Sequence, residues 1–324
     1  MFGYGLYALG VTFTYTIVSL AAVTSITPDL GDTSGGDLHT IVGTGFTGAT
    51  DVRIGGTTAI GFSVISDTEI IVIIPAHVAA TGQSVEVNNV AWSAANTLFE
   101  FWSPAELSPT AYWDRGNYQD VTAGTWPPAV VSLPELVQAT AAYQPTEVML
   151  EPDFDGTDDL LSCASNLVDL VSLAAGTMVV MFAADSALPR TALPSGGYAD
   201  PALIGDTNYD TWLKFTQDGV TALAYPGAYV EVTATCPADG SLHLAVMRWD
   251  SINLGLTLDG AAETTTSCAE LTTMTGTVQV GKGYEAADFF DGRIRMILTM
   301  NTTISSANIT KLTKWAQACR GLES

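Results

Sequence analysis

The chain has 324 residues, of which 47% are apolar and only 14% charged, and its formal net charge is −23. The apolar content supports a sizeable core and argues against intrinsic disorder. Because only 11 residues are Lys or Arg, no basic stripe is present to neutralise nucleic-acid phosphates or to hold an anionic membrane surface. The acidity indicates a soluble, self-repelling exterior.

Residues 1–22 form an arm without a charged side chain. Glycines interrupt its first half, and residues 11–18 mix aromatic residues with threonines, which favours a β-strand over a membrane-spanning helix. The arm lacks the basic start of a signal peptide, so we expect it to be retained and docked on its own domain or on a partner. The anchoring residues that we predict are Phe2, Tyr4, Tyr7, Phe13 and Tyr15.

Residues 23–102 contain short apolar runs separated by glycine turns, at the spacing of a small immunoglobulin-like β-sandwich. Their motifs follow the order Ile26-Thr27-Pro28, Gly35-Gly36, Ile41-Val42-Gly43-Thr44-Gly45-Phe46, Gly55-Gly56, Ser66-Asp67-Thr68-Glu69-Ile70 and Pro75. This order resembles the IPT/TIG family. The resemblance implies a spacer or docking module. Ser-Pro pairs at 103–104 and 108–109 mark the end of the module.

Residues 103–324 predict a larger β-sandwich. Two similar turns stand 136 residues apart, and each joins an aromatic residue to Asp-Gly, a pair that suits a tight hairpin turn: Phe154-Asp155-Gly156 and Phe290-Asp291-Gly292. Together with Leu107–Asp114, Leu136–Pro145, Asp239–Val246 and Leu256–Gly260, they resemble a laminin-G-like, concanavalin A-like jelly roll. That resemblance implies a domain that presents a binding surface more often than an enzyme.

One helix is predicted near the C-terminus, because apolar residues recur there at helical spacing. Ser305 or Ser306 can cap its start. The apolar stripe consists of Ile309, Leu312, Trp315, Ala316 and Cys319. We expect this stripe to pack on the sandwich.

Glu151, Asp153 and Asp155 alternate along one predicted strand, which puts them on one face. Laminarinase-type glucanases share the jelly roll and use carboxylates at such positions as nucleophile and acid. Pro152 fits poorly in a central strand, and no second carboxylate triplet of this kind occurs. The histidines, His39, His77 and His243, form no arrangement typical of a catalytic site. We therefore predict no enzymatic activity and no catalytic residue.

Four cysteines occur, none in a C-x-x-C pair, so a zinc site is not expected. Leu242–Trp249 and Leu254–Leu258 are predicted to be the two arms of a hairpin. In it, the numbers of two residues that lie opposite each other add up to about 503. Cys236 and Cys268 bracket this hairpin, so they are candidates for a disulfide. The alternative is that both are small buried apolar residues.

The segment 205–212 is the best predicted ligand site, because it joins carboxylates and an amide to two aromatic residues. Tyr and Trp faces can stack on sugar rings, and carboxylates can bind calcium. The predicted glycan-binding residues are Asp206, Asn208, Tyr209, Asp210 and Trp212. The predicted metal ligands are Asp158, Asp159 and Asp206, with calcium as the one cofactor considered. The alternative is a solvated hairpin loop.

The sequence thus predicts an all-β protein with an apolar arm (1–22), an immunoglobulin-like domain (23–102) and a jelly roll with one C-terminal helix (103–324). The resemblances imply a non-enzymatic phage virion accessory protein, in the capsid decoration or the tail. Its arm would hold other virion proteins, in an oligomeric assembly, and its jelly roll would contact host-surface glycans. A secreted bacterial surface adhesin is the alternative, and a glucanase-like polysaccharide hydrolase is a third.

Overall fold

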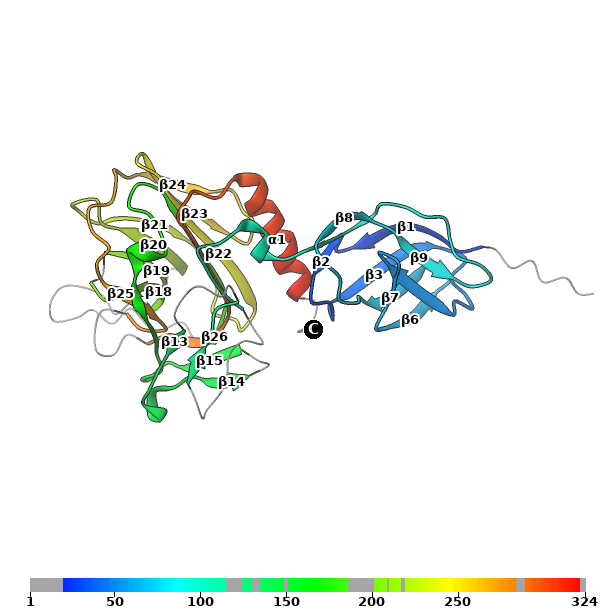
Figure 1. Cartoon of the computed structure of the whole chain (residues 1–324), viewed down its shortest axis with the longest axis horizontal. Helices are drawn as coiled ribbons and strands as arrows, with labels where there is room; N and C mark the ends of the chain where they lie inside the picture. The colour runs from blue at the N-terminus through cyan, green and yellow to red at the C-terminus, as the bar shows by residue number, and fades with distance from the viewer. Residues whose placement is uncertain are drawn as a thin grey trace, which may run out of the picture. The chain divides into compact units, whose positions relative to one another are not determined.

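The computed structural model describes residues 20–114, 124–129, 135–148, 151–185, 201–208, 210–216, 219–283 and 289–320. The chain divides into two compact units, Met1–Phe101 and Trp102–Ser324, each built from antiparallel strands (Figure 1). The predicted all-β class with a C-terminal helix is confirmed. The five predicted anchoring residues, Phe2, Tyr4, Tyr7, Phe13 and Tyr15, lie outside the described residues.

The first unit is a small immunoglobulin-like sandwich. Its largest sheet has the order β1 (Ala22–Thr27), β3 (Leu38–Thr44), β7 (Glu69–Ile73), β6 (Gly61–Ser66). Two three-stranded sheets complete it, β2 (Leu30–Asp32), β10 (Phe99–Trp102), β8 (Ala80–Gln83) and β5 (Thr57–Thr58), β4 (Asp51–Ile54), β9 (Val85–Asn88). Alternating apolar residues of these strands fill the core, including Ile41, Val52, Ile70, Val72 and Phe101.

The second unit contains two large antiparallel sheets. The β26 sheet has the order β14 (Thr146–Val148), β15 (Glu151–Asp155), β26 (Asp291–Met300), β17 (Gly176–Ala184), β22 (Leu242–Trp249), β23 (Asn253–Leu258), β24 (Thr264–Ser267), and β11 (Ala111–Asp114) also pairs with β26. The β19 sheet has the order β12 (Thr125–Trp126), β13 (Leu136–Val137), β16 (Leu161–Asn166), β25 (Thr277–Val280), β18 (Ala202–Asp206), β19 (Thr211–Thr216), β20 (Gly219–Ala224), β21 (Val230–Ala234).

The two sheets pack face to face through one apolar core. Phe182 of the β26 sheet lies 5.7 Å from Phe215 of the β19 sheet and 6.1 Å from Phe290, measured between ring centroids. Both sheets add aliphatic residues, among them Val180, Ile294, Leu213, Ala222 and Val278. This sandwich is the predicted jelly roll, and its strands position the candidate sites below.

The two Phe-Asp-Gly segments meet in this sandwich, because β15 and β26 are antiparallel neighbours. The second is not the predicted hairpin turn, since Asp291 and Gly292 already belong to β26. Phe154 lies opposite Gly292, and Asp155 lies opposite Asp291. The rings of Phe154 and Phe290 are 6.1 Å apart. The matching motifs therefore mark two paired strands of one sheet.

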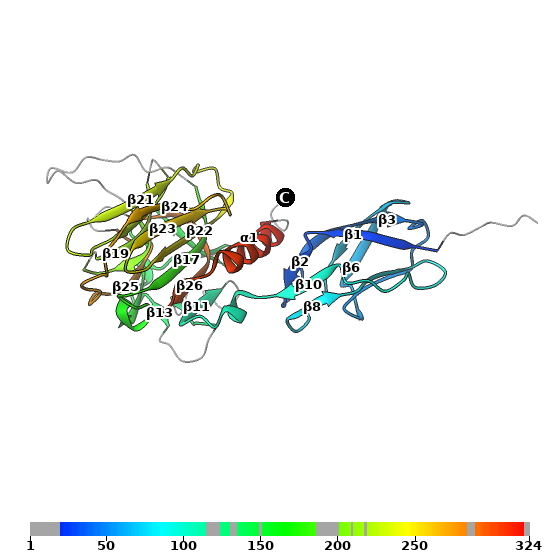
Figure 2. The same ribbon diagram turned by 90° about the horizontal axis from the view of Figure 1, so that it is seen from above.

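The helix α1 (Ser306–Arg320) lies against β22, on the side of the β26 sheet away from the core (Figure 2). The hydroxyl oxygen of Ser305 accepts the backbone N–H of Asn308 at 3.2 Å, which caps the helix. All five residues of the predicted stripe are buried, with Leu312 and Trp315 at the centre. The predicted packing of this helix on the sandwich is confirmed. Among the described residues, no helix is long and apolar enough to cross a bilayer.

Candidate functional site

The turn between β18 and β19 contains the predicted glycan-binding residues. Asp206 is buried at its base, and its Oδ1 accepts the backbone N–H groups of Asp210 at 2.8 Å and Thr211 at 3.4 Å. Burial raises the pKa of the Asp206 carboxyl, although these hydrogen bonds favour its charged form. Asp206 therefore holds the turn together from a buried position.

Trp212 is also buried, with 5% of its surface exposed. It lies opposite Gly205 in the hairpin, and a Cβ on that glycine would come within 2.9 Å of the indole ring. The glycine lets the indole lie flat against the backbone. Because the indole is covered, the prediction that it stacks on a sugar is not supported.

Two of the predicted residues remain accessible in this turn. Asn208 is exposed, and its Nδ2 donates to the hydroxyl of Thr275 at 2.7 Å, while Asp210 is half-buried. Tyr209 lies outside the described residues. The accessible part of the predicted glycan site is therefore polar.

A pair of tyrosines beside this turn was missed by the sequence analysis. Ala224 of β20 lies opposite Thr211 of β19 on one side and opposite Val230 of β21 on the other. The β20–β21 turn therefore lies next to the Asp206–Thr211 turn, at one end of the β19 sheet. In it, the rings of Tyr225 and Tyr229 lie 5.0 Å apart at 57°, and Tyr229 is 61% exposed. The sequence signal was Tyr-Pro-Gly-Ala-Tyr at 225–229, a turn with two aromatic residues.

The loop before β25 closes the same end of the sheet. The hydroxyl of Thr272 donates to the Tyr225 carbonyl at 3.4 Å, and Thr275 holds Asn208 as described above. We call Asn208, Asp210, Tyr225, Tyr229 and Thr272 the tyrosine end. It combines an exposed aromatic ring with amide, carboxylate and hydroxyl groups, a set that can stack on and hydrogen-bond to a sugar.

Three carboxylates gather at the first Phe-Asp-Gly turn. Oxygens of Asp155, Asp158 and Asp159 lie within 4.8 Å of one another. Asp159 is buried, its Oδ2 accepts the N–H of Asp155 at 2.9 Å, and burial raises its pKa to about 6. Asp158 and Asp159 of the predicted metal set therefore come together with Asp155, whereas Asp206 lies at the far end of β18 and is not part of this group.

The carboxylates of β15 have different surroundings. Glu151 is buried, and its two oxygens lie 3.6 Å from Nη1 of Arg293 and 3.4 Å from Nη1 of Arg295. Burial raises the pKa of Asp153, helped by Asp185 and opposed by Arg293. Glu151 is 1% exposed and both arginines engage its carboxylate, so it offers no accessible nucleophile or acid to a substrate. The arrangement fits a structural role.

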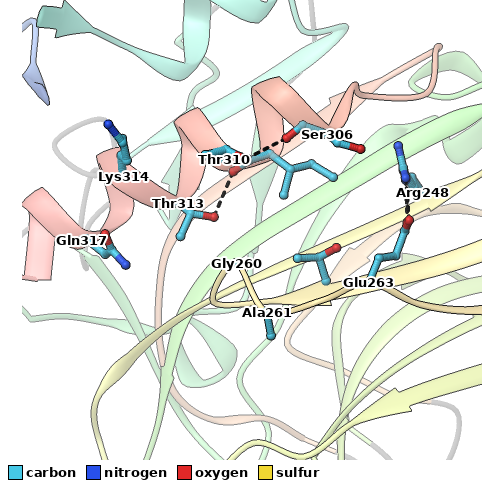
Figure 3. A pocket seen from close by; sticks show the side chains of 11 residues that line it. Arg248, Gly260, Ala261, Glu263, Ser306, Thr310, Thr313, Lys314 and Gln317 are labelled. Carbon is cyan, nitrogen blue, oxygen red and sulfur yellow. Dashed lines mark hydrogen bonds and ion pairs between the residues drawn. The ribbon is translucent and has the colours of Figure 1, made fainter.

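A cavity of about 330 Å³ lies between α1 and the β22–β23 side of the sheet (Figure 3). On the sheet side, Arg248 forms a two-fold ion pair with Glu263 (2.5 Å for each contact), and its Nη1 donates to the Ile304 carbonyl at 2.8 Å. On the helix side, the hydroxyls of Thr310 and Thr313 donate to carbonyls one turn earlier. Most polar groups of the cavity are thus already paired within the protein.

The two candidate disulfide cysteines lie apart, and both thiols are free. Cys236 contacts His243 near the start of β22, whereas the N–H of Cys268 donates to Ile252, beyond the end of that strand. The predicted hairpin itself is confirmed, since Trp249 pairs with Leu254. The disulfide prediction is contradicted because β24 folds back along β23 and returns Cys268 to the opposite end. The alternative, two buried small apolar residues, describes both cysteines.

Comparison with known proteins identifies the first unit. Residues 21–101 match the model of the IPT/TIG domain, so the chain carries an IPT/TIG domain there. No curated protein matches the sequence.

Several solved structures resemble this chain at low identity. A structure reported for cell entry of botulinum neurotoxin type C through two ganglioside molecules is 10% identical with a TM-score of 0.45, over 65% of this chain and 52% of that chain. Domain 4 of AbnA, an extracellular arabinanase from Geobacillus stearothermophilus, in complex with arabinotriose, is 10% identical with a TM-score of 0.48, over 63% and 98%. The CBM40 of a Ruminococcus gnavus IT-sialidase, bound to sialyllactose, is 18% identical with a TM-score of 0.35, over 43% and 83%.

The chain spans about half the length of the neurotoxin structure that it matches. All three TM-scores lie below 0.5, so these likenesses assign no function to this chain.

Proposed function

We propose that this protein is a non-enzymatic accessory protein on the surface of a phage particle, in the capsid decoration or the tail. Its N-terminal part anchors it to other virion proteins, and its sandwich contacts host-surface glycans. The observation that carries the glycan contact is the tyrosine pair, with Tyr229 exposed, beside the polar turn at one end of the β19 sheet. An aromatic face with nearby amide and carboxylate groups is the chemistry that holds a sugar ring.

The absence of catalysis in this proposal rests on the ion-pair cluster around Glu151. The side chain of this residue is 1% exposed and its carboxylate faces two guanidinium groups, so a polysaccharide has no access to it. A glucanase would lose activity when Glu151 and Asp153 are replaced by Ala. Absence of glucan cleavage by the unaltered chain supports the non-enzymatic proposal, and cleavage that these replacements abolish overturns it.

The glycan contact is tested with the full chain on a glycan array, with and without calcium. We expect retention of a defined glycan class, and Tyr229→Ala should reduce the signal. If calcium is needed, Asp158→Asn should remove that requirement or the binding, because Asp158 belongs to the carboxylate group at the first Phe-Asp-Gly turn. A blank array under both conditions refutes glycan contact.

The place in the particle is tested separately, by mass spectrometry of purified phage particles. We expect peptides from both units of the chain. Particles without this chain contradict the virion role. A mature protein that starts near residue 22 would instead favour the secreted adhesin.

A further inference from the structure

The strand β6 is an uncovered edge of the largest sheet in the IPT/TIG domain. It pairs with β7 on one side, and none of the described residues pairs with its other side. Gly61–Ser66 contains no charged residue and no proline, two of the devices that protect edge strands. The register is irregular only between Val64 and Ser66, so the first part of the edge is regular.

The inner face of β6 is incompletely covered. Phe62 lies opposite Val72, and Val64 lies opposite Ile70, so both face the same side as the core. Val72 and Ile70 are fully buried, but Val64 is 38% exposed because the sheet ends beside it. One more strand with apolar residues on that face would cover Phe62 and Val64 and would extend the core.

The sequence contains a strand-like segment that suits this edge. Residues 11–18 read Val-Thr-Phe-Thr-Tyr-Thr-Ile-Val, which alternates large apolar residues with threonines and has no charge, glycine or proline. In an extended conformation one of its faces is apolar and the other carries hydroxyls. Because neither this segment nor β6 is charged, their pairing brings no like charges into direct contact.

Chain length prevents this segment from reaching β6 of its own molecule. The strand β1 begins at Ala22 on the opposite edge, so a strand added to β6 would lie four strand spacings away, about 19 Å. The four residue steps from Val18 to Ala22 reach at most about 14 Å. Pairing with the free edge of β1 would need a tight turn at Ser19-Leu20-Ala21, which has no Gly, Asn or Asp.

We propose that residues 11–18 of one copy of this chain add as a further strand to β6 of a second copy. The inference rests on the proposed function, in which the N-terminal part docks on a partner within the particle, and it makes that partner a second copy of this chain. Each copy offers both an arm and an edge, so reciprocal exchange closes a two-fold dimer, whereas one-way addition builds a ring or an open row of copies.

The test is the mass of the full chain in solution, measured by size-exclusion chromatography with light scattering over a range of concentrations. We expect at least twice the mass of one chain. Thr14→Pro should give the monomer, because proline removes a backbone donor from the added strand, and the position precedes the IPT/TIG match at 21–101. Thr14→Ala is the matched control and should keep the assembly.

The acceptor edge is tested in the same way. Val64→Lys should weaken association at least about ten-fold, whereas Val42→Lys should leave it unchanged, since Val42 is exposed on β3, which has neighbours on both sides. A monomeric full chain, an assembly that survives Thr14→Pro, or equal effects of the two lysines would each overturn the inference. A monomeric chain that is still found in particles refutes this inference and leaves the virion role standing.

Discussion

The Nδ1 of His243 lies 2.7 Å from Oδ2 of Asp259, across the β22–β23 hairpin. The hydrogen bond to Asp259, followed by one to Cys236, raises the pKa of His243 to about 10 against the opposing effect of burial. The other oxygen of Asp259 accepts the N–H of Leu244 at 2.9 Å. A charged histidine thus joins the loop before β22 to the end of β23 over the whole neutral pH range.

This pair predicts a pH-dependent stability. The folded pKa lies above the unfolded value of about 6.5, so the stabilisation is complete below about pH 6.5 and is lost as the pH rises towards 10. Asp259→Asn should lower the free energy of unfolding by roughly 1–3 kcal/mol at pH 6, and it should make the fall in stability with rising pH less steep. Urea unfolding at a series of pH values measures both, with the exposed Glu270→Gln as the control. An equally steep decline in Asp259→Asn would disprove the assignment.

Asp159 should show linkage of the same sign in a lower pH window, although here the charged form is the unfavourable one. Its folded pKa of about 6 lies above the unfolded value of about 3.9, so its charge destabilises the fold above pH 6 and the cost disappears as the pH falls. Asp159→Asn should keep the acceptor for the Asp155 N–H and should raise the free energy of unfolding at pH 7.5. Carboxyl NMR titration reads the pKa directly. A value below 4 would contradict this expectation.

Glu151→Gln should destabilise the sandwich strongly. The change leaves the buried guanidinium of Arg295 without its carboxylate charge, and breaking a buried pair from one side costs roughly 3–5 kcal/mol. Chemical denaturation measures the loss. Glu231→Gln, at an exposed position on β21, should stay within about 0.5 kcal/mol of the parent chain. Equal stability of the two variants would show that the cluster contributes nothing.

Tyr229→Ala should weaken glycan binding by roughly 2–10-fold, the range expected when one exposed aromatic contact of about 0.5–1.5 kcal/mol is lost. The melting temperature should change little, because the ring is 61% exposed. Tyr143→Ala is the matched control, since that ring is 43% exposed at a different turn. Binding is measured by titration calorimetry with a glycan retained on the array. Equal affinities of the two variants would place the glycan elsewhere.

Trp212→Ala should act on stability first. Removing a buried indole costs roughly 3–5 kcal/mol, so the variant should unfold at lower urea. Below its melting temperature it should still bind glycan per folded molecule. A stable variant that has lost binding would restore Trp212 as a ligand residue.

Much of the fold could be predicted from local patterns. The turn residues located the hairpin that pairs Trp249 with Leu254, and the helical spacing located α1. The errors arose where a residue depends on a neighbour that is distant in sequence or topology. Trp212 lies in a polar segment, yet Gly205 across the hairpin makes room to bury it. Cys268 was misplaced because the direction of β24 is set by tertiary pairing.

In the candidate site too, some features could be predicted from local sequence and others depend on how distant strands pair. The polar character of residues 206–210 could be read from the sequence, but the tyrosine pair could not be placed beside them without the register of β19, β20 and β21. Likewise, the group of Asp155, Asp158 and Asp159 follows from one turn, whereas Asp206 required knowledge of where β18 lies.

The place of β26 in its sheet determines when the sandwich can fold during synthesis. Ala111 pairs with Thr299, and Asp153 pairs with Arg293, so early strands of the second unit need partners made almost last. The IPT/TIG domain is complete by residue 101 and can fold while the ribosome is still making the rest. The sandwich must hold its early strands unpaired until then, which makes this stage of translation the period when a nascent chain is most prone to misfolding.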